Sequence, residues 1–254
     1  MWTPAGPETA GTLASHAVLS ATNIVKRFGG VTALAGVDLE LGEGEVLGLI
    51  GPNGSGKTTL VNCISGVLAI DEGTIRLRDR SLARASRARR ARAGIARTFQ
   101  TPRLFAGLTV RENVSAGLRA AGRVRGTRAR EQVNALLGRF QLERLSREVV
   151  SSLPYGHQRR VEIARALAGA PGVLLLDEPA AGLNDAETAE LKALIGYIER
   201  DHGCSIIVID HDMSLIMGVS HRIQVLDEGR VIFTGDPSDA FRQREVVEAY
   251  LGTA

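Results

Sequence analysis

The sequence predicts an α/β fold into which a block of helices is inserted, and three observations support this prediction. A glycine-rich loop at residues 51–59 follows the short apolar run 46–50 and precedes a helical pattern. Continuous apolar runs at 173–176 and 206–209, separated by a helical pattern, are typical of parallel strands covered on both faces. Between these two parts, residues 109–121, 127–140 and 158–168 have helical periodicity.

The other elements are predicted in chain order from the same patterns. Strands are expected at 19–28, 31–41 and 45–50, and the third of them delivers the glycine-rich loop. A helix from 57 to about 67, a strand at 74–77, a helix at 82–94 and an extended piece at 95–100 follow. After the helical block, Asn184 and Glu187 have the spacing of an N-cap and its partner for a helix at 186–200. A hairpin at 223–226 and 230–233 and two short helices end the chain.

The composition is that of a globular protein with nearly balanced charge. The chain has 254 residues and a net charge of +3, and only Lys26, Lys57 and Lys192 among its 31 basic residues are lysines. No apolar run approaches the roughly 18 residues of a membrane span, so we expect the chain by itself to be soluble. Residues 1–18 lack the features of a signal peptide and are expected to form a flexible tail. Cys63 and Cys204 are expected to be small core residues in a reducing compartment.

The glycine-rich loop fits the pattern G-x-x-x-x-G-K-[ST], which favours phosphate binding. Its backbone N–H groups can point inward, and the following helix adds the positive end of its dipole. Lys57 is placed to reach the β and γ phosphates of a nucleotide, and the hydroxyl of Thr58 to ligate the Mg²⁺ that bridges them. A glycine-rich structural turn is the alternative. The candidate nucleotide-binding residues are Gly51, Pro52, Asn53, Gly54, Ser55, Gly56, Lys57, Thr58 and Thr59.

Two acidic residues, Asp177 and Glu178, follow the apolar run 173–176. The carboxyl ends of strands are where open α/β sheets bind their ligands. We expect Asp177 to hold Mg²⁺, directly or through water, and Glu178 to be the base for the attacking water. Ordinary capping or solvated carboxylates are the alternative, but a phosphate loop in the same chain favours the chemical role.

Gln100 and His211 also lie at the ends of extended segments. The amide of Gln100 can contact both Mg²⁺ and the nucleophilic water, and His211 can hydrogen-bond the γ-phosphate. A lone histidine is more often structural and a lone glutamine more often a surface residue. Their placement relative to the other motifs is what makes both of them candidates.

Five motifs occur in a characteristic order: the phosphate loop, Thr-Phe-Gln at 98–100, Tyr-Gly-His-Gln-Arg-Arg at 155–160, Leu-Asp-Glu-Pro at 176–179 and Asp-His-Asp at 210–212. This order resembles the ATP-binding subunits of ABC transporters. Within that superfamily, segments 97–105, 178–184, 211–213 and 249–252 are similar to those of branched-chain amino acid importers. The resemblance implies an ABC-type nucleotide-binding domain over residues 19–254, with an antiparallel β subdomain and an inserted helical subdomain at about 101–168.

The resemblance also implies a mechanism that needs two subunits. Two nucleotide-binding domains close head to tail, and each ATP lies between the phosphate loop of one and the signature segment of the other. The signature residues are here Tyr155, Gly156, His157 and Gln158. Phe28 matches the aromatic residue that stacks on adenine, and a core residue at a strand end is the alternative.

The implied partners follow from the same resemblance. They are a second ATPase subunit, either identical or a paralogue, two transmembrane permeases, and indirectly an extracytoplasmic binding protein. In the family, Gln100 and the helical block carry movement to the permeases through short cytoplasmic helices. The chain would then lie at the cytoplasmic face of the membrane and use ATP and Mg²⁺ to drive uptake.

The chain departs from the family pattern at two positions. The signature usually reads Leu-Ser-Gly-Gly-Gln, and Pro154 stands in place of the serine. Proline has neither a hydroxyl nor a backbone N–H to donate to a γ-phosphate, so this composite site is expected to bind ATP but to turn over more slowly than the other site of a heterodimer. Asn184 stands where an aspartate is common, which keeps the capping ability and loses a charge.

Arginines form two clusters, Arg84, Arg87, Arg89, Arg90, Arg92 and Arg97, and Arg119, Arg123, Arg125, Arg128 and Arg130. A solvated helix face is the expected explanation, and attraction to anionic lipid or to an acidic partner is the alternative. Nucleic acid is not expected as a partner, because no aromatic residue is interleaved with the arginines.

Other functions remain open on the sequence alone. They are an importer for urea or amides, a lipopolysaccharide exporter, a soluble ABC protein that acts on ribosomes or DNA, and a subunit that binds ATP without hydrolysing it. A single cassette without heptads argues against the soluble proteins, which carry two cassettes or long coiled coils. Glu178 and His211 favour retained hydrolysis.

Overall fold

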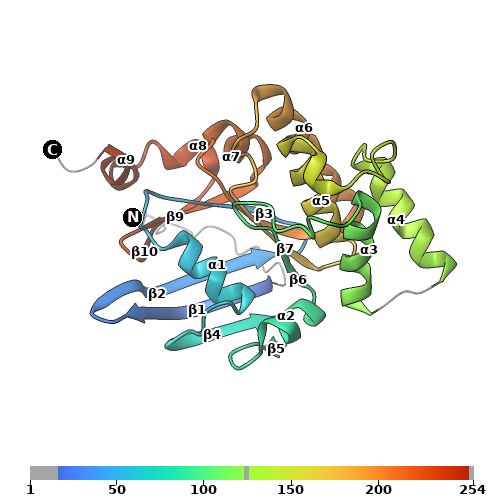
Figure 1. Cartoon of the computed structure of the whole chain (residues 1–254). Coiled ribbons are helices and arrows are strands. Elements are labelled where there is room, and N and C mark those ends of the chain that lie inside the picture. Colours follow the sequence, from blue (N-terminus) through green and yellow to red (C-terminus); the bar gives the residue numbers. More distant parts are fainter. Residues whose placement is uncertain (1–16, 123–125, 252–254) are drawn as a thin grey trace, which may run out of the picture.

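The computed structural model describes residues 17–122 and 126–251, which form two sheets and the helices that cover them (Figure 1). The four-stranded sheet is antiparallel and has the order β2 (Val31–Gly42), β1 (Ala17–Phe28), β4 (Glu72–Leu77) and β5 (Arg80–Ser81). The six-stranded sheet has the order β10 (Arg230–Gly235), β9 (Arg222–Asp227), β3 (Val46–Ile50), β8 (Ser205–Ile209), β7 (Val173–Asp177) and β6 (Ile95–Arg97). It is parallel from β9 to β6, and β10 joins its edge as the second strand of an antiparallel hairpin. The predicted α/β class is therefore confirmed.

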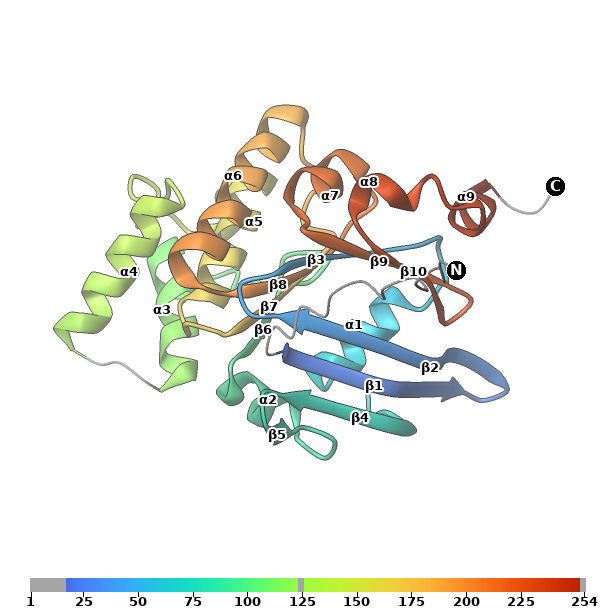
Figure 2. The same cartoon turned by 180° about the vertical axis from the view of Figure 1, so that it is seen from behind.

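Helix α1 (Lys57–Ser65) packs between the two sheets (Figure 2). Its buried Leu60, Val61 and Ile64 join one core with side chains of β1 and β2 and with one face of the parallel sheet. Strands β3, β7 and β8 are buried along their whole length, as their continuous apolar runs predict.

Most of the other helices cover the opposite face of the parallel sheet. These are α3 (Val110–Ala121), α5 (Tyr155–Leu167), α6 (Asp185–His202) and α7 (Met213–Val219), while α4 (Thr127–Arg139) packs against α3. A short α2 (Arg87–Ala93) precedes β6, a 3-10 turn at Val150–Ser152 precedes α5, and α8 (Pro237–Ala240) and α9 (Arg244–Leu251) end the described chain. Leu136, Phe140 and Leu167 are among the side chains that join the helices to the sheet in a second core.

Local signals explain where several helices begin. The predicted capping pair is confirmed, because Asn184 accepts from the backbone N–H of Glu187 and Glu187 accepts from that of Asn184, both at 3.0 Å. Thr109 and Glu112 form the same box at the start of α3. Such pairs satisfy N–H groups that the first turn of a helix leaves without partners.

Several elements differ from the sequence-based expectation, among them the helix predicted at 158–168, which begins at Tyr155. The helix predicted at 82–94 begins only at Arg87, because Leu82 is buried in the core and Ser86 caps the helix. Helix α7 was not predicted, since seven residues after the cap Asp212 give too short a pattern. Strand β1 begins at Ala17 rather than 19, and the rest of the predicted tail lies outside the described residues.

Both cysteines are free and buried, as expected for core residues. Burial raises the pKa of the Cys63 thiol to about 11 and that of Cys204 to about 12, so both stay protonated and unreactive near neutral pH. Among residues 17–122 and 126–251, none of the helices has the length and hydropathy needed to cross a bilayer.

We expect Gly117→Ala to loosen the contact between α3 and α5. A Cβ atom at Gly117 would lie 2.0 Å from the carbonyl oxygen of Arg165, so the two helix backbones must separate. This overpacking should lower the free energy of unfolding by about 1–3 kcal/mol in urea denaturation. Gly138→Ala in α4 is the control, because its Cβ meets only the flexible carboxylate of Glu143, at 2.9 Å. Equal stability of the two variants would contradict this account of the packing.

Candidate active site

The phosphate loop connects β3 to α1 in a conformation that only glycine allows at two positions. Gly51 has φ +144°, and a Cβ atom there would lie 2.0 Å from the carbonyl oxygen of Leu226. Gly56 has φ +106°, and a Cβ atom there would lie 2.7 Å from the carbonyl oxygen of Ala33. Neighbouring backbone therefore fixes the path of the loop and leads it directly into α1.

Lys57, the first residue of α1, lies folded over this loop. Its ammonium group donates to the carbonyl oxygens of Gly51 and Pro52, both at 2.8 Å, and the residue is buried. Burial lowers the pKa of Lys57, and the nearby carboxylate of Glu178 opposes that shift. The phosphate loop and the predicted base are thus close enough to interact electrostatically.

The parallel strands bring the other predicted residues to the same edge of the sheet. Asp177 ends β7, Gln100 follows β6, and Asp210 and His211 follow β8, the strand between β3 and β7. The backbone N–H of Glu178 donates to the carbonyl of Ile209 at 2.7 Å, which joins the ends of β7 and β8. Asp210 is buried and accepts from the backbone N–H of Ala180 at 2.8 Å, which holds the loop after Glu178.

Glu178 is the meeting point of the predicted catalytic side chains. One carboxylate oxygen accepts from the amide nitrogen of Gln100 at 2.6 Å, and the other lies 3.4 Å from Nε2 of His211. The backbone of Glu178 has φ +46°, a left-handed conformation that is uncommon outside glycine and frequent at functional sites. The structure therefore brings Gln100, Glu178 and His211 together.

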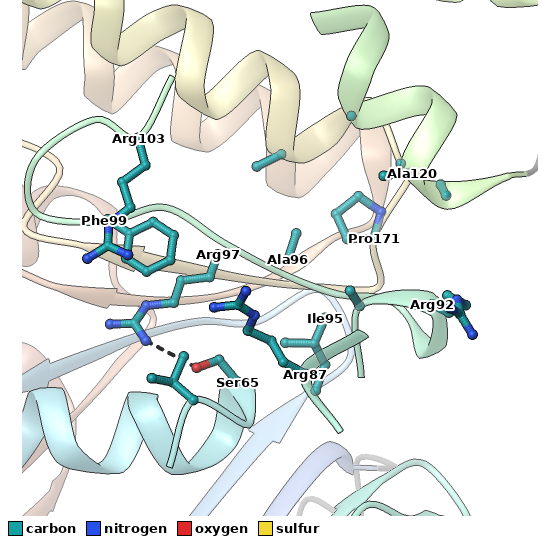
Figure 3. A pocket seen from close by; sticks show the side chains of 16 residues that line it. Ser65, Arg87, Arg92, Ile95, Ala96, Arg97, Phe99, Arg103, Ala120 and Pro171 are labelled. Atoms are coloured by element: carbon teal, nitrogen blue, oxygen red, sulfur yellow. Dashed lines mark hydrogen bonds between the residues drawn. The ribbon is translucent and has the colours of Figure 1, made fainter. Parts of the chain in front are cut away.

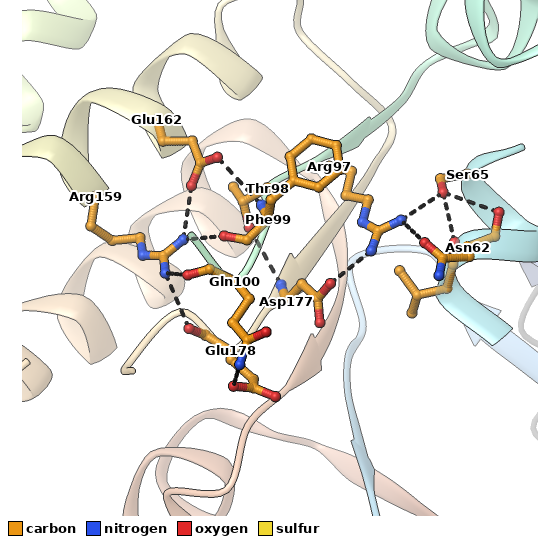
Figure 4. Close-up of polar contacts among 11 residues, drawn as sticks. Asn62, Ser65, Arg97, Thr98, Phe99, Gln100, Arg159, Glu162, Asp177 and Glu178 are labelled. Atoms are coloured by element: carbon orange, nitrogen blue, oxygen red, sulfur yellow. Dashed lines mark hydrogen bonds and ion pairs between the residues drawn. The ribbon is translucent and has the colours of Figure 1, made fainter. Parts of the chain in front are cut away.

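Asp177 is buried and forms an ion pair that the sequence analysis did not predict. Arg97 donates to its carboxylate at 2.7 Å and also to the side chains of Asn62, at 2.6 Å, and Ser65, at 3.1 Å (Figure 4). The Arg97 side chain is only 8% exposed. It thus ties the end of β7 to α1, the helix that carries Lys57.

The predicted Mg²⁺ ligands fit that ion chemically. Thr58 offers a hydroxyl, Asp177 a carboxylate and Gln100 an amide carbonyl, and Mg²⁺ prefers oxygen ligands of this kind. Gln100 donates to Glu178 through its nitrogen, which leaves its carbonyl oxygen as a ligand. Thr58 and Gln100 are exposed, and Asp177 is buried at the end of β7.

The predicted signature residues lie at the start of α5, where Tyr155 contacts the segment that carries Gln100. Pro154 is the N-cap, and the Tyr155 hydroxyl donates to the carbonyl of Gln100 at 3.2 Å. Gly156 is buried so tightly that a Cβ atom would lie 2.3 Å from the carboxylate of Glu187. Within the described residues, no hydrogen bond or ion pair joins residues 154–158 to the phosphate loop.

Phe28 is 46% exposed at the end of β1, which excludes the core role that the sequence left open. The ammonium group of Lys26 lies 5.4 Å from its ring centroid. An exposed aromatic ring is available for stacking, and its contact with adenine stays a prediction.

The arginine clusters are solvated only in part. In the described residues, Arg84, Arg87, Arg89, Arg92, Arg119, Arg128 and Arg130 are exposed, and Arg123 and Arg125 lie outside that part. The expectation is wrong for Arg90, which is buried and donates to the carbonyls of Cys63 and Ile64 at 2.6 and 2.8 Å. There it caps the C-terminal end of α1, where a cation is favourable. Arg97 is the second exception.

Sequence reasoning also missed a buried pair on α5, Arg159 and Glu162. A signal was present, since two opposite charges at i and i+3 interrupt an otherwise apolar helix face. Their partners lie about 60 residues earlier in the chain, and only the fold brings them together.

A groove of about 390 Å³ opens beside this site (Figure 3). It lies between the α1–β6 region and helices α3 and α5, and its walls include Val67, Arg87, Arg97, Phe99, Gly117 and Ala166. Phe99 lies between two arginines, since the guanidinium carbons of Arg97 and Arg103 are 4.9 and 4.3 Å from its ring centroid. Arg97 therefore belongs both to the wall of the groove and to the ion pair with Asp177.

Comparison with known proteins agrees with this geometry. A family model described as ABC transporter matches residues 34–181. The chain is 41% identical to the high-affinity branched-chain amino acid transport ATP-binding protein LivG of Salmonella typhimurium, over 94% of this chain and 100% of that protein. It is 38% identical, over the same shares, to BraF of Pseudomonas aeruginosa, which carries the same description.

Solved structures show the same fold. The ADP conformation of MJ1267, an ATP-binding cassette of an ABC transporter, superposes with a TM-score of 0.83 at 30% identity, over 93% of this chain and 99% of that one. The dimeric cassette MJ0796 bound to ADP and Pi has a TM-score of 0.78 at 28% identity, over 86% and 98%. The family match, the relatives and the fold agree, and this chain belongs to the ABC transporter family as an ATP-binding domain.

Proposed function

We propose that this chain is the ATP-hydrolysing subunit that energises an importer of branched-chain amino acids. The cluster of Gln100, Glu178 and His211 close to Lys57 is the observation that carries the hydrolytic role. Similarity to LivG and BraF, which are described as branched-chain amino acid transport proteins, supports the substrate class.

The proposed roles follow from the contacts. Residues 51–59 bind the phosphates of ATP through backbone N–H groups and Lys57. Glu178 accepts the proton of the attacking water, and Gln100 and His211 orient that water and the γ-phosphate. Thr58, Gln100 and Asp177 would hold Mg²⁺, which supplies positive charge against the charge that develops on the phosphates.

Two subunits are needed for the complete site in this proposal. The signature residues Tyr155, Gly156, His157 and Gln158 make no hydrogen bond to the phosphate loop of their own chain, within the part described. The dimeric state of MJ0796 with ADP and Pi supports a dimer, and in our proposal each signature faces the nucleotide of the other subunit. Phe28 then stacks on adenine in its own subunit.

The groove of Figure 3 is the proposed docking place for a permease at the cytoplasmic face of the membrane. It is partly apolar, and Arg87, Arg97 and Arg103 line it, which suits a short helix with acidic residues. Because Arg97 also pairs with Asp177, a helix in the groove would contact a residue that is bonded to the proposed ATP site. A second permease and an extracytoplasmic binding protein would complete the transporter.

The division of the chain also stays a prediction. We propose an ABC ATPase domain over 19–254 with a helical subdomain at about 101–168, which corresponds to the region of α3, α4 and α5. Another transported substrate, such as urea, amides or lipopolysaccharide, and a soluble ABC function are the alternatives that the experiments below must separate.

Glu178→Gln should retain ATP binding and lose hydrolysis by roughly a hundredfold or more, because the amide keeps the shape and removes the base. Binding of a fluorescent ATP analogue and phosphate release measure the two quantities. Lys57→Ala is the control with the opposite pattern, since it removes the main cationic partner of the phosphates and should abolish binding itself. Hydrolysis at the wild-type rate by Glu178→Gln would refute the assignment of the base.

Pro154→Ser should accelerate hydrolysis, by up to roughly tenfold if its hydroxyl donates to the γ-phosphate in the transition state. Pro154 is the exposed N-cap of α5, and serine is a better N-cap, so the helix should be retained. Pro154→Ala is the matched control, because it restores the backbone N–H without a hydroxyl. An unchanged rate in Pro154→Ser would argue against a weakened signature.

Affinity purification from gently solubilised native membranes tests the transport role. We expect two multi-span permeases and a second ATPase subunit to copurify, and the identity of that subunit shows whether the dimer is homomeric. Uptake of radiolabelled leucine, with and without this chain, then tests the substrate. Copurification of ribosomal or DNA-associated proteins without a permease would overturn the transport proposal.

A further inference from the structure

The buried pair Arg159–Glu162 on α5 contacts both the signature segment and the segments that carry Gln100 and Glu178. Both side chains are 1% exposed, and a guanidinium nitrogen of Arg159 donates to Glu162 at 2.8 Å. The pair lies within two turns of the signature residues and one helix turn from Tyr155, whose hydroxyl accepts from Arg159 at 3.1 Å. The signature residues and this pair therefore lie in the first turns of the same helix.

The guanidinium of Arg159 donates to three backbone carbonyls from two other segments (Figure 4). Its donors contact Phe99 at 2.6 Å, Gln100 at 2.5 Å and Glu178 at 3.3 Å. Gln100 and Glu178 are the residues whose side chains meet in the candidate active site. One buried side chain thus holds the backbone of both of them.

Glu162 binds the same loop through that loop's backbone N–H groups. Its carboxylate accepts from the backbone N–H groups of Phe99, at 3.3 Å, and Arg103, at 3.1 Å. The pair therefore binds the 99–103 loop through carbonyls and N–H groups together, so that the loop cannot rotate without breaking several charge-assisted hydrogen bonds.

This pair is costly to bury. Burial raises the pKa of Glu162, although Arg159 and the two backbone N–H groups oppose the rise. Buried ion pairs are frequently no more stabilising than apolar side chains of the same volume. Stability alone therefore does not explain why this helix face carries two charges. The contacts of Arg159 with Gln100 and Glu178 offer an explanation for them.

We propose that Arg159, held in place by Glu162, is a positioning residue for hydrolysis, which fixes Gln100 and Glu178 through their backbone carbonyls and moves them together with the signature helix. In a dimer, each subunit would contribute its signature to one ATP site and its Gln100 and Glu178 to the second ATP site. Arg159 would then connect these two sites within one chain. The proposal rests on the roles proposed above for Gln100 and Glu178.

Arg159→Lys tests this role. Lysine keeps the charge opposite Glu162, but its single ammonium group cannot reach three carbonyls and the Tyr155 hydroxyl as the planar guanidinium does. We expect kcat to fall roughly tenfold to a hundredfold while the Kd for a fluorescent ATP analogue stays unchanged, since a small displacement of catalytic groups impairs chemistry rather than binding.

Arg90→Lys is the matched control. Arg90 is also a buried arginine that donates to three backbone carbonyls, but none of the three belongs to Gln100 or Glu178. They are the carbonyls of Ala85 and, at the end of α1, of Cys63 and Ile64. It should hydrolyse ATP at the wild-type rate. Rates are compared at a temperature at which circular dichroism shows every variant to be folded.

The double variant Arg159→Met with Glu162→Leu separates positioning from stability. It leaves neither member of this pair without its partner, so its unfolding temperature should lie closer to wild type than that of Arg159→Met alone. Its kcat should nevertheless remain low. A wild-type kcat in this variant or in Arg159→Lys would overturn the proposal.

Glu178→Gln, measured in parallel, tells the two hypotheses apart. If that variant is inactive while Arg159→Lys has the wild-type kcat, only the positioning role fails. If Glu178→Gln itself is fully active, the proposed function of the cluster fails first.

Discussion

Parallel pairing of β3, β8, β7 and β6 requires these strands to end at the same edge of the sheet, and the chemistry of the chain depends on that constraint. Asp177 pairs in register with Ile209, so the residues that follow, Glu178 and Asp210, leave the sheet side by side. Segments that are far apart in sequence thereby deliver a phosphate loop, two carboxylates, an amide and an imidazole to one place.

Charge burial is the second constraint, and it is met by hydrogen bonds that cross between elements. Arg97 joins β6 to β7 and α1, Arg159 joins α5 to two loops, and Arg90 caps α1 from α2. An arginine can do this because its planar fork donates in several directions at once. The arginine-rich composition is therefore partly structural, and some of the exposed arginines, such as Arg87 and Arg103, line the groove.

What the sequence could predict depended on the range of the interactions involved. Continuous apolar runs located β7 and β8, and the short-range pair Asn184 and Glu187 located the start of α6. The motif residues Gln100, Glu178 and His211 could be proposed because strand ends collect ligands, but their mutual contacts could not. Arg90 and Arg97 could not be predicted, since an arginine in a basic run looks solvated until its distant carbonyl or carboxylate partner is known.

The two sides of the site differ in how firmly they are held, and this difference bears on how such a site can work. The phosphate loop is braced from outside, because Gly51 donates its N–H to the Tyr250 hydroxyl at 2.8 Å and Gly229 donates to the carbonyl of Ser55 at 3.0 Å. Burial raises the pKa of Tyr250, so its hydroxyl remains a neutral acceptor at physiological pH. The side chains of Gln100 and His211, in contrast, are exposed and both contact Glu178, while Arg159 holds the backbone of Gln100 and Glu178. In the proposed function, nucleotide binds first to the fixed phosphate loop. Closure against a second subunit would then bring these exposed side chains into their working positions.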